Sequence, residues 1–522
     1  MRHSRPPWFL IAIGAVVAIA ISLPIFYLFL RAGGAGADEV WKLLSRRKTL
    51  EVLRDSAGLA ALVTICSALI SVPLAFLTLR TDLPGRKFWA IATTLPLAVP
   101  SYVGSFALIA TFGTRGTWLQ KLLEPLGVQE LPSIYGWPGA TLSLTLFTYP
   151  YLLISVRSGL LLIDPSLEEA ARNLGHNALS TFWRVTLPQL RPSLVAGGLL
   201  VALYSLRDFG TPSLMRFDSF TRVIFTQYTS SFNRNSAAVL ALVLVAVVWF
   251  ILWLEYRARN RAAYYSNSSA SGRPQPTVHL GLWKWPALAF CSIVVALGLV
   301  LPVATAIIWL WRGLNAESIS PKLLEAAFNS LLASSLAAIA ATLFALPVAI
   351  LGVRFPGKIS TLIERCTYVG FGLPGIVVAL SLVFVGARYL PMLYQTLPML
   401  VFAYLVLFLP QSVGTIRSSL LQVNPQLEES ARSLGRTPWQ TWREITLPLV
   451  APGVIGGSLL VFLTAIKELP ATMLLSPIGF RTLATEIWSA TEDVAFADAA
   501  AASLALLVVS AGSTLVLLWR KE

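Results

Sequence analysis

The chain has 522 residues, of which 56% are hydrophobic and only 12% are charged. Soluble proteins carry about 25% charged residues, and the apolar residues here gather in runs of roughly 20, so the composition excludes an ordinary soluble protein and indicates a polytopic membrane protein. The net charge of +15 does not indicate nucleic-acid binding, because the basic residues lie mostly in short loops between the apolar runs.

The first apolar run, residues 8–30, follows a basic N-terminus and resembles a secretory signal peptide. The apolar part of a signal peptide is about 7–15 residues long, whereas this run is long enough to cross a bilayer, so we expect a retained transmembrane helix. The chain is predicted to be an all-α protein with 12 membrane spans. These lie near residues 8–30, 56–80, 88–112, 137–163, 193–214, 236–256, 286–311, 326–352, 366–387, 396–421, 453–475 and 497–519.

The second half of the chain repeats the first. Glu168 and Glu428 are 260 positions apart (428 − 168), and Arg80 and Arg354 are 274 apart (354 − 80). Because each half carries six spans, both halves point the same way, and we expect two parallel six-helix repeats related by a pseudo-twofold axis along the membrane normal. The predicted units are a first repeat at 1–256, a polar linker at 257–285 and a second repeat at 286–522.

The distribution of Lys and Arg among the loops favours a cytoplasmic N-terminus. In this topology the linker lies in the cytoplasm. So do two polar stretches that interrupt the apolar runs, at residues 164–190 and 424–450.

Residues 164–190 carry the signals of a short helix followed by a second one. Asp164 before Pro165 is a typical N-cap with proline at the first helical position, and Asn424 before Pro425 repeats it. Gly175 is placed where a glycine commonly ends a helix. The sequence therefore predicts a short helix between Asp164 and Gly175.

One face of this predicted helix is narrow and apolar. Leu167, Ala170, Ala171 and Leu174 recur with helical spacing. One such stretch is explained equally well as a loop that folds against the ends of the spans. Two copies with the same pattern favour a helix that inserts into a shallow groove on a partner protein.

The spacing E-A-A-x3-G-x9-[IV]-x-L-P occurs from Glu169 to Pro188 and again from Glu429 to Pro448, with Ser430 replacing the first alanine of the second copy. It resembles the EAA loop of ATP-binding-cassette (ABC) importer permeases, and the resemblance extends over nearly the whole chain. It implies the type I ABC importer permease fold, and a coupling helix in each loop that docks into a cytoplasmic ATPase. The residues implied for ATPase coupling are Glu168, Glu169, Ala170, Ala171, Leu174 and Gly175 in the first copy and Glu428, Glu429, Ala431, Leu434 and Gly435 in the second.

The resemblance also implies partners and a location. Such a permease lies in the bacterial inner membrane and works with two copies of an ATPase subunit, which hold ATP and Mg, and with a periplasmic substrate-binding protein. It implies no cofactor in this chain. Most of these permeases pair two separate subunits, whereas this chain resembles both fused. The stretch "LFTYPYLLISVRSGLLLIDPSLEEAARNLG" is similar to bacterial ferric-iron importer permeases, especially those of cyanobacteria, with thiamine or another small solute as the alternative substrate.

The nearest approach to a nucleotide-binding motif is incomplete. Gly352, Gly357 and Lys358 nearly fit a P-loop, but Ile359 stands where the motif needs a hydroxyl residue to bind Mg²⁺. We therefore expect that this chain is not itself an enzyme and that the ATPase is a separate subunit.

Charges within the spans indicate a substrate pathway. Arg207 and Asp208 occupy the same repeat position as Lys467 and Glu468, and ionisable residues inside a membrane usually mark a pathway. Tyr204 is a further candidate. The alternative is that these charges reach the membrane interface or pair across helices. Because each acid follows a base, and the Cys and His residues are scattered, no metal site is assigned.

Two other classes of membrane protein share parts of this pattern. A secondary transporter also has parallel six-span repeats, but it has no use for two matched cytoplasmic docking loops. A membrane-embedded enzyme needs a cluster of catalytic His, Cys or acidic residues in its spans, and the sequence contains no such cluster.

Overall fold

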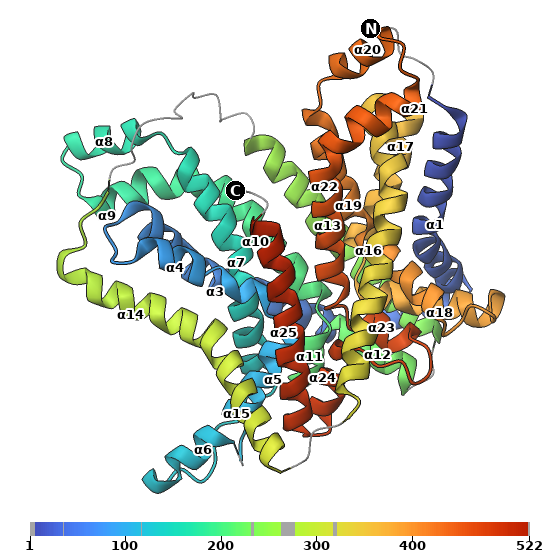
Figure 1. The fold of residues 1–522 in the computed structure, drawn as a ribbon. Coiled ribbons are helices and arrows are strands. Elements are labelled where there is room, and N and C mark those ends of the chain that lie inside the picture. The colour runs from blue at the N-terminus through green and yellow to red at the C-terminus, as the bar shows by residue number, and fades with distance from the viewer. Residues whose placement is uncertain are drawn as a thin grey trace.

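The computed structural model describes residues 6–34, 36–115, 117–230, 234–262, 277–316 and 321–519, which are mostly helical. Nine helices in this part of the chain are long and apolar enough to cross a membrane (Figure 1). They are α1 (Trp8–Gly33), α3 (Arg47–Arg80), α7 (Trp137–Leu162), α10 (Leu187–Arg207), α13 (Arg234–Ala262), α14 with α15 (Lys284–Val295 and Leu301–Asn315), α16 (Leu323–Arg354), α19 (Leu397–Gln422) and α22 (Leu447–Ala465). Each covers one of the predicted spans, and α25 (Phe496–Trp519) takes the place of the last one.

The third predicted span of each repeat is broken instead of straight. Residues 88–112 form α4 (Arg86–Ala92), a short 3₁₀ turn and α5 (Ser101–Phe112), and the two arms meet at 95°. In the second repeat α17 (Lys358–Tyr368) and α18 (Gly375–Tyr389) are separated in the same way. Pro100 and Pro374 stand at the two breaks, and proline lacks an N–H group and disfavours helix in the residue before it. Hydropathy alone does not register such a break.

The fifth span of each repeat also ends earlier than predicted. α10 stops at Arg207 and α11 (Gly210–Leu214) starts at a new angle, and α22 stops before α23 (Pro470–Leu475). The predicted ranges 193–214 and 453–475 therefore each contain two helices. The repeated charges lie at these two turns.

The two repeats interleave in space. Ile21 and Leu28 of α1 lie in the same hydrophobic core as Leu380 and Val383 of α18, and α1 also packs on α16 and α17. In the opposite direction, α15 packs on α5 of the first repeat. The predicted boundaries 1–256 and 286–522 describe units of sequence, while the first helix of each repeat packs against the other repeat. The boundaries themselves stay a prediction.

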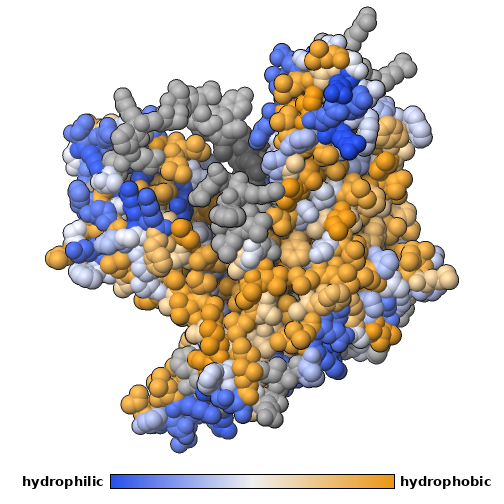
Figure 2. Space-filling model, in the orientation of Figure 1, coloured by the Kyte–Doolittle hydropathy of each residue, from blue (hydrophilic) through white to orange (hydrophobic). Residues whose placement is uncertain are grey.

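On the face shown in Figure 2, hydrophobic surface forms a broad band across the middle of the molecule, with hydrophilic surface toward its two ends. α1 starts and α25 finishes on the side that carries the polar helices α8 (Pro165–Asn173) and α20 (Pro425–Ser433) (Figure 1). This arrangement fits two repeats with an even number of crossings each.

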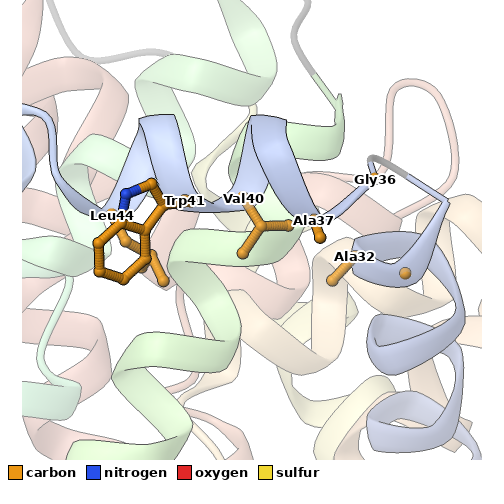
Figure 3. Close-up of a pocket in the computed structure, with 7 residues that line it drawn as sticks. Ala32, Gly36, Ala37, Val40, Trp41 and Leu44 are labelled. Atoms are coloured by element: carbon orange, nitrogen blue, oxygen red, sulfur yellow. The ribbon is translucent and has the colours of Figure 1, made fainter.

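Short helices cover the opposite end, namely α2 (Ala37–Leu44), α6 (Trp118–Leu123), α12 (Phe220–Thr229) and α24 (Leu483–Glu492). Ala37, Val40, Trp41 and Leu44 line one side of α2 and frame a shallow pocket with Ala32 of α1 (Figure 3). Trp41 is exposed. A helix with one apolar side and an exposed tryptophan suits the boundary between lipid and water.

The predicted linker is partly described. Its first residues continue α13 to Ala262, and residues 263–276 lie outside the described ranges. Beyond them Val278 pairs with Thr81 at the end of α3. The Leu280 backbone N–H donates to the Asp82 carboxylate, and His279 lies 3.0 Å from it; together they hold the pKa of that carboxyl below its usual value. The end of the linker is therefore attached to the first repeat.

Candidate functional site

The polar helices α8 and α20 form where the sequence predicts them, and Figure 1 shows them on separate lobes of the molecule. The Asp164 carboxylate accepts a hydrogen bond from the Ser166 backbone N–H at 2.9 Å. The Asn424 side-chain oxygen accepts one from the Gln426 N–H at 3.0 Å. Both bonds satisfy amide groups that have no partner in the first helical turn.

Each helix ends on a glycine with left-handed backbone. Gly175 has φ of +88° and Gly435 of +87°. The Gly175 N–H donates to the Arg172 carbonyl at 2.9 Å, and the His176 N–H donates to the Ala171 carbonyl at 3.1 Å. These two bonds make a Schellman motif, which explains why glycine suits this position. The second copy has the same bonds from Gly435 to Arg432 and from Arg436 to Ala431.

The two sides of each polar helix have different surroundings. Leu174 is 81% exposed and Leu434 is 85% exposed, whereas Ala171 and Ala431 are buried. The predicted apolar stripe is therefore split, because the chain after Gly175 turns back under the helix and covers the side that carries Ala171. The candidate coupling residues that remain exposed are Glu169, Ala170, Leu174 and Gly175 in the first copy and Glu429, Leu434 and Gly435 in the second.

Glu168, a candidate coupling residue, faces the interior instead of the surface. Its carboxylate lies 3.6 Å from the Arg80 guanidinium at the end of α3, and both side chains are at least 95% buried. The Thr186 hydroxyl donates to the same carboxylate at 2.9 Å. Arg80 also donates to the Leu160 carbonyl at 3.0 Å, so it joins α3, α7 and α8.

The second copy repeats this arrangement. Arg354 at the end of α16 lies 2.8 Å from Glu428 and also donates to the Val423 carbonyl at 3.3 Å. The Thr446 hydroxyl donates to Glu428 at 3.0 Å. A carboxylate with a cationic and a hydroxyl partner, buried in the first copy and partly exposed in the second, holds each polar helix to the end of a membrane helix.

The second helix of each loop leads directly into the next span. α9 (Ala178–Thr181) passes through a π-turn at Phe182–Thr186 into α10. Pro188 lies in the first turn of α10, where the absent N–H is tolerated. From α9 onward the loop therefore continues as helix into the membrane, while a turn at residues 174–177 separates α8 from α9.

The repeated acids in the fifth spans cap the short helices that follow. The Asp208 carboxylate accepts from the Thr211 backbone N–H at 2.9 Å and from the Ser101 hydroxyl at 2.6 Å. Glu468 accepts from the Ala471 N–H at 3.3 Å. Both carboxylates are thus engaged by backbone amides of α11 and α23, which are positions where a negative charge is favourable.

The two copies differ by a compensating exchange. Ser101 and Gly375 hold the same repeat position, 274 apart (375 − 101), directly after the break in the third span. Any Cβ atom at Gly375 would collide with the Glu468 carboxylate. With the Glu468 side chain in this position, the longer acid of the second repeat occupies the space that a side chain at Gly375 would need, whereas the shorter Asp208 leaves room for a serine that hydrogen-bonds to it.

The repeated bases cross between the repeats. The Arg207 guanidinium donates to the Leu373 carbonyl of the second repeat at 2.9 Å. The Lys467 ammonium donates to the Ala98 carbonyl of the first repeat at 2.8 Å. Both carbonyls belong to the broken third spans, on the residues just before the arms α5 and α18.

The last predicted pathway residue, Tyr204, is half-buried, and its ring packs at a tilt of 37° against that of Tyr151, with 5.5 Å between ring centroids. Among the described residues, no group of three or more His, Cys, Asp and Glu side chains is arranged to hold a metal ion. The structure thus gives each repeated charge a protein partner. Whether these residues also meet substrate stays a prediction.

Sequence reasoning missed the roles of Arg80, Arg354, Ser101 and the two carbonyls. Arg80 and Arg354 were recognisable as an aligned pair of basic residues at the ends of spans. Their partners were not, because pairing across 88 positions (168 − 80) depends on how the polar helix folds back. Main-chain carbonyls leave no signal in a sequence.

A family model described as binding-protein-dependent transport system inner membrane component matches residues 67–263 and 341–521. The chain is 34% identical over 510 residues to the Fe(3+)-transport system permease protein FbpB 2 of Haemophilus influenzae, covering 97% of each chain. It is 24% identical to the probable ABC transporter permease protein y4fN of Sinorhizobium fredii, over 91% of this chain and 87% of the relative.

Shorter relatives match about half of the chain. The molybdate/tungstate transport system permease protein WtpB of Pyrococcus furiosus is 25% identical over 253 residues, which is 48% of this chain and 94% of that relative. Together with the two matches of the family model, this confirms that the chain is a fusion of two related units.

Proposed function

We infer the function from a premise that the comparisons establish: this chain belongs to the inner membrane components of binding-protein-dependent transport systems. It is the membrane-spanning permease of an ABC importer. We propose that it carries ferric iron, delivered by a periplasmic binding protein, across the bacterial inner membrane. The observation that carries this proposal is the 34% identity to a Fe(3+)-transport permease over 97% of both chains.

We propose that α8 and α20 are the two coupling helices. They are the exposed polar helices at one end of the molecule, each with an outward leucine and each held to a span by a glutamate that pairs with an arginine. One docking helix per repeat predicts one copy of this chain with two copies of a cytoplasmic ATPase, which bind ATP and Mg. The native mass of the purified complex tests this ratio, and two copies of this chain per ATPase pair would contradict it.

The proposed orientation places α8, α20, the linker and the N-terminus in the cytoplasm. It rests on the Lys and Arg distribution and on the common side of α8, α20 and the start of α1. The short helices at the other end, including α2, then face the periplasm, where the binding protein docks.

The substrate is tested by asking which loaded binding protein stimulates ATP hydrolysis. The complete complex is reconstituted in lipid nanodiscs, and the binding protein is added empty, with ferric iron, or with thiamine, sulfate or molybdate. We expect ferric iron alone to raise hydrolysis above the level of the empty protein. Stimulation by thiamine or an oxyanion and not by ferric iron would overturn the substrate assignment and leave the importer class in place.

A further inference from the structure

We propose that Arg207 and Lys467 are gating residues, each of which clamps the broken third span of the opposite repeat and holds the two repeats together at the level of the breaks. This inference rests on the proposed function, because a gate has meaning only in a transporter. The observation is the reciprocal pair of bonds from Arg207 to Leu373 and from Lys467 to Ala98.

The acceptors are carbonyls that the helix break leaves without a partner. In a continuous helix the Leu373 carbonyl would accept from the Val377 N–H, but that N–H donates to the Pro374 carbonyl at 3.0 Å. Ala98 is the last residue of the 3₁₀ turn before Pro100. Carbonyls at the end of a helix need an outside donor, and a cation inside a membrane needs an acceptor, so each group supplies what the other lacks.

The donors are held in place by the acids beside them. Asp208 and Glu468 cap α11 and α23, so the turn after each base is tied to the following short helix. Each base therefore projects from a fixed corner toward the opposite repeat. The acids are positioning residues in this arrangement, and their place in the chain directly after the bases is explained.

The symmetry of the two bonds suits a gate. Each runs from a fifth span of one repeat to a third span of the other, so any separation of the repeats at this level breaks both. The coupling helices lie on separate lobes at the far end (Figure 1). α8 ends in the turn at Gly175, after which α9, the π-turn and α10 continue as helix to Arg207. The Thr186–Glu168 hydrogen bond ties α8 to the π-turn. Movement of α8 by the ATPase therefore reaches Arg207 through this bond and α10, and movement of α20 reaches the turn that carries Lys467 in the same way, through the Thr446–Glu428 bond and α22.

The test compares Arg207→Met/Lys467→Met with Arg157→Met. Arg157 is a matched control, because it also donates to a main-chain carbonyl at 2.9 Å, but to Ala90 of its own repeat. Spin labels at cysteines that replace Leu126 and Met392 report the distance between the repeats in nanodiscs, with the native cysteines changed to serine. Both residues are exposed, Leu126 at the end of a 3₁₀ turn in the first repeat and Met392 in a turn of the second. This arm needs neither ATPase nor binding protein.

We expect the double variant to show longer label distances without ATP, while Arg157→Met keeps the wild-type distance. In the complete complex the double variant should hydrolyse ATP about fivefold faster than wild type without binding protein, because opening no longer has to break the two bonds. The variant Arg207→Lys/Lys467→Arg retains two donors and should restore low basal hydrolysis.

Unchanged label distances in the double variant, or the same change in Arg157→Met, would overturn the gate. If the double variant does not fold, the single variant Lys467→Met is measured against the same control and decides in the same way. If no loaded binding protein stimulates ATP hydrolysis by the wild-type complex, that result counts against the proposed function. The label distances would still show whether Arg207 and Lys467 hold the two repeats together.

Discussion

Arg80 and Glu168 form a buried ion pair whose loss has a clear expected cost. Removing one partner of such a pair leaves an uncompensated charge and typically costs about 3–5 kcal/mol. We expect Arg80→Met or Glu168→Leu to lower the free energy of unfolding by about this amount, and Arg80→Met/Glu168→Leu to be less destabilised than the sum of the two. Thermal unfolding in detergent ranks the variants by stability.

The matched control for this pair is exposed. Arg436 and Glu444 lie 3.3 Å apart with side chains about half exposed, and surface pairs contribute roughly 0–1 kcal/mol. Arg436→Met should therefore change stability little. A loss as large as that of Arg80→Met would show that burial does not set the cost.

Substitutions at Gly175 and Gly435 would strain the backbone without creating a steric clash inside this chain. A Cβ at either position meets no atom within 4 Å, so the expected cost of Gly175→Val, about 1–2 kcal/mol, comes from the left-handed backbone. We expect weaker recovery of the ATPase in pull-down, most clearly in Gly175→Val/Gly435→Val. Gly357→Val is the control, because Gly357 has equal space but φ of −173°. Equal recovery from the two-site variant and from this control would contradict the prediction.

Variants of Asp208 and Glu468 distinguish a role in helix capping from a role in handling substrate. We expect Asp208→Ala and Glu468→Ala to impair transport more than folding. Asp208→Asn and Glu468→Gln keep an oxygen that accepts from the amides of α11 and α23, so they should retain transport if capping is the whole role. Transport assays together with thermal unfolding decide. Loss of transport in the amide variants with unchanged stability would show that the negative charge itself is needed.

For single residues, the sequence predicts those features that depend only on near neighbours in the chain. The N-caps Asp164 and Asn424 and the terminal Gly175 are identified by their own neighbours in the chain, and the structure shows each in its expected geometry. The burial of Glu168 and the cross-repeat bonds of Arg207 were not predictable, because both depend on which distant segment covers them.

At the scale of elements, α8 and α20 each present one large leucine to solvent. Leu174 and Leu434 are among the most exposed large apolar residues of the described chain, and burial of such a side chain typically contributes about 1.5–3 kcal/mol. We expect Leu174→Asp/Leu434→Asp to abolish ATPase recovery without loss of the membrane-inserted chain. Leu126→Asp is the control, since Leu126 is 77% exposed at the opposite end. Normal recovery from the Leu174→Asp/Leu434→Asp variant would contradict docking by these helices.

The existence of most spans was predictable, and their interruptions were not. An apolar run of membrane length indicates a crossing, but Pro100 and Pro374 break two of these runs without making them less apolar. The turns at Asp208 and Glu468 have the same character. Each break was visible in the sequence only as a proline or a charge inside an apolar run, and what it does became clear from the helices on either side.

For the whole molecule, the sequence offsets of 260 and 274 predict the duplication, but they do not predict that the two repeats interleave in space. Sequence alignment pairs α1 with α14 and α15, but nothing in either sequence says that each packs on the opposite repeat. That packing means that the two halves form their cores together. The shared cores also connect the two lobes that carry the docking helices with the level at which we propose the gate.

Uptake of radioactive ferric iron into liposomes that hold this chain with its ATPase shows whether the chain is an ATP-driven permease for ferric iron. We expect uptake only when ATP is enclosed with the ATPase on the same side as α8 and α20, and when the binding protein loaded with ferric iron is present on the other side. Arg157→Met should behave as wild type, and Leu174→Asp/Leu434→Asp should abolish uptake. Uptake by this chain alone, driven by an ion gradient and unaffected by ATP, would show that the chain is a secondary transporter and not an ABC permease.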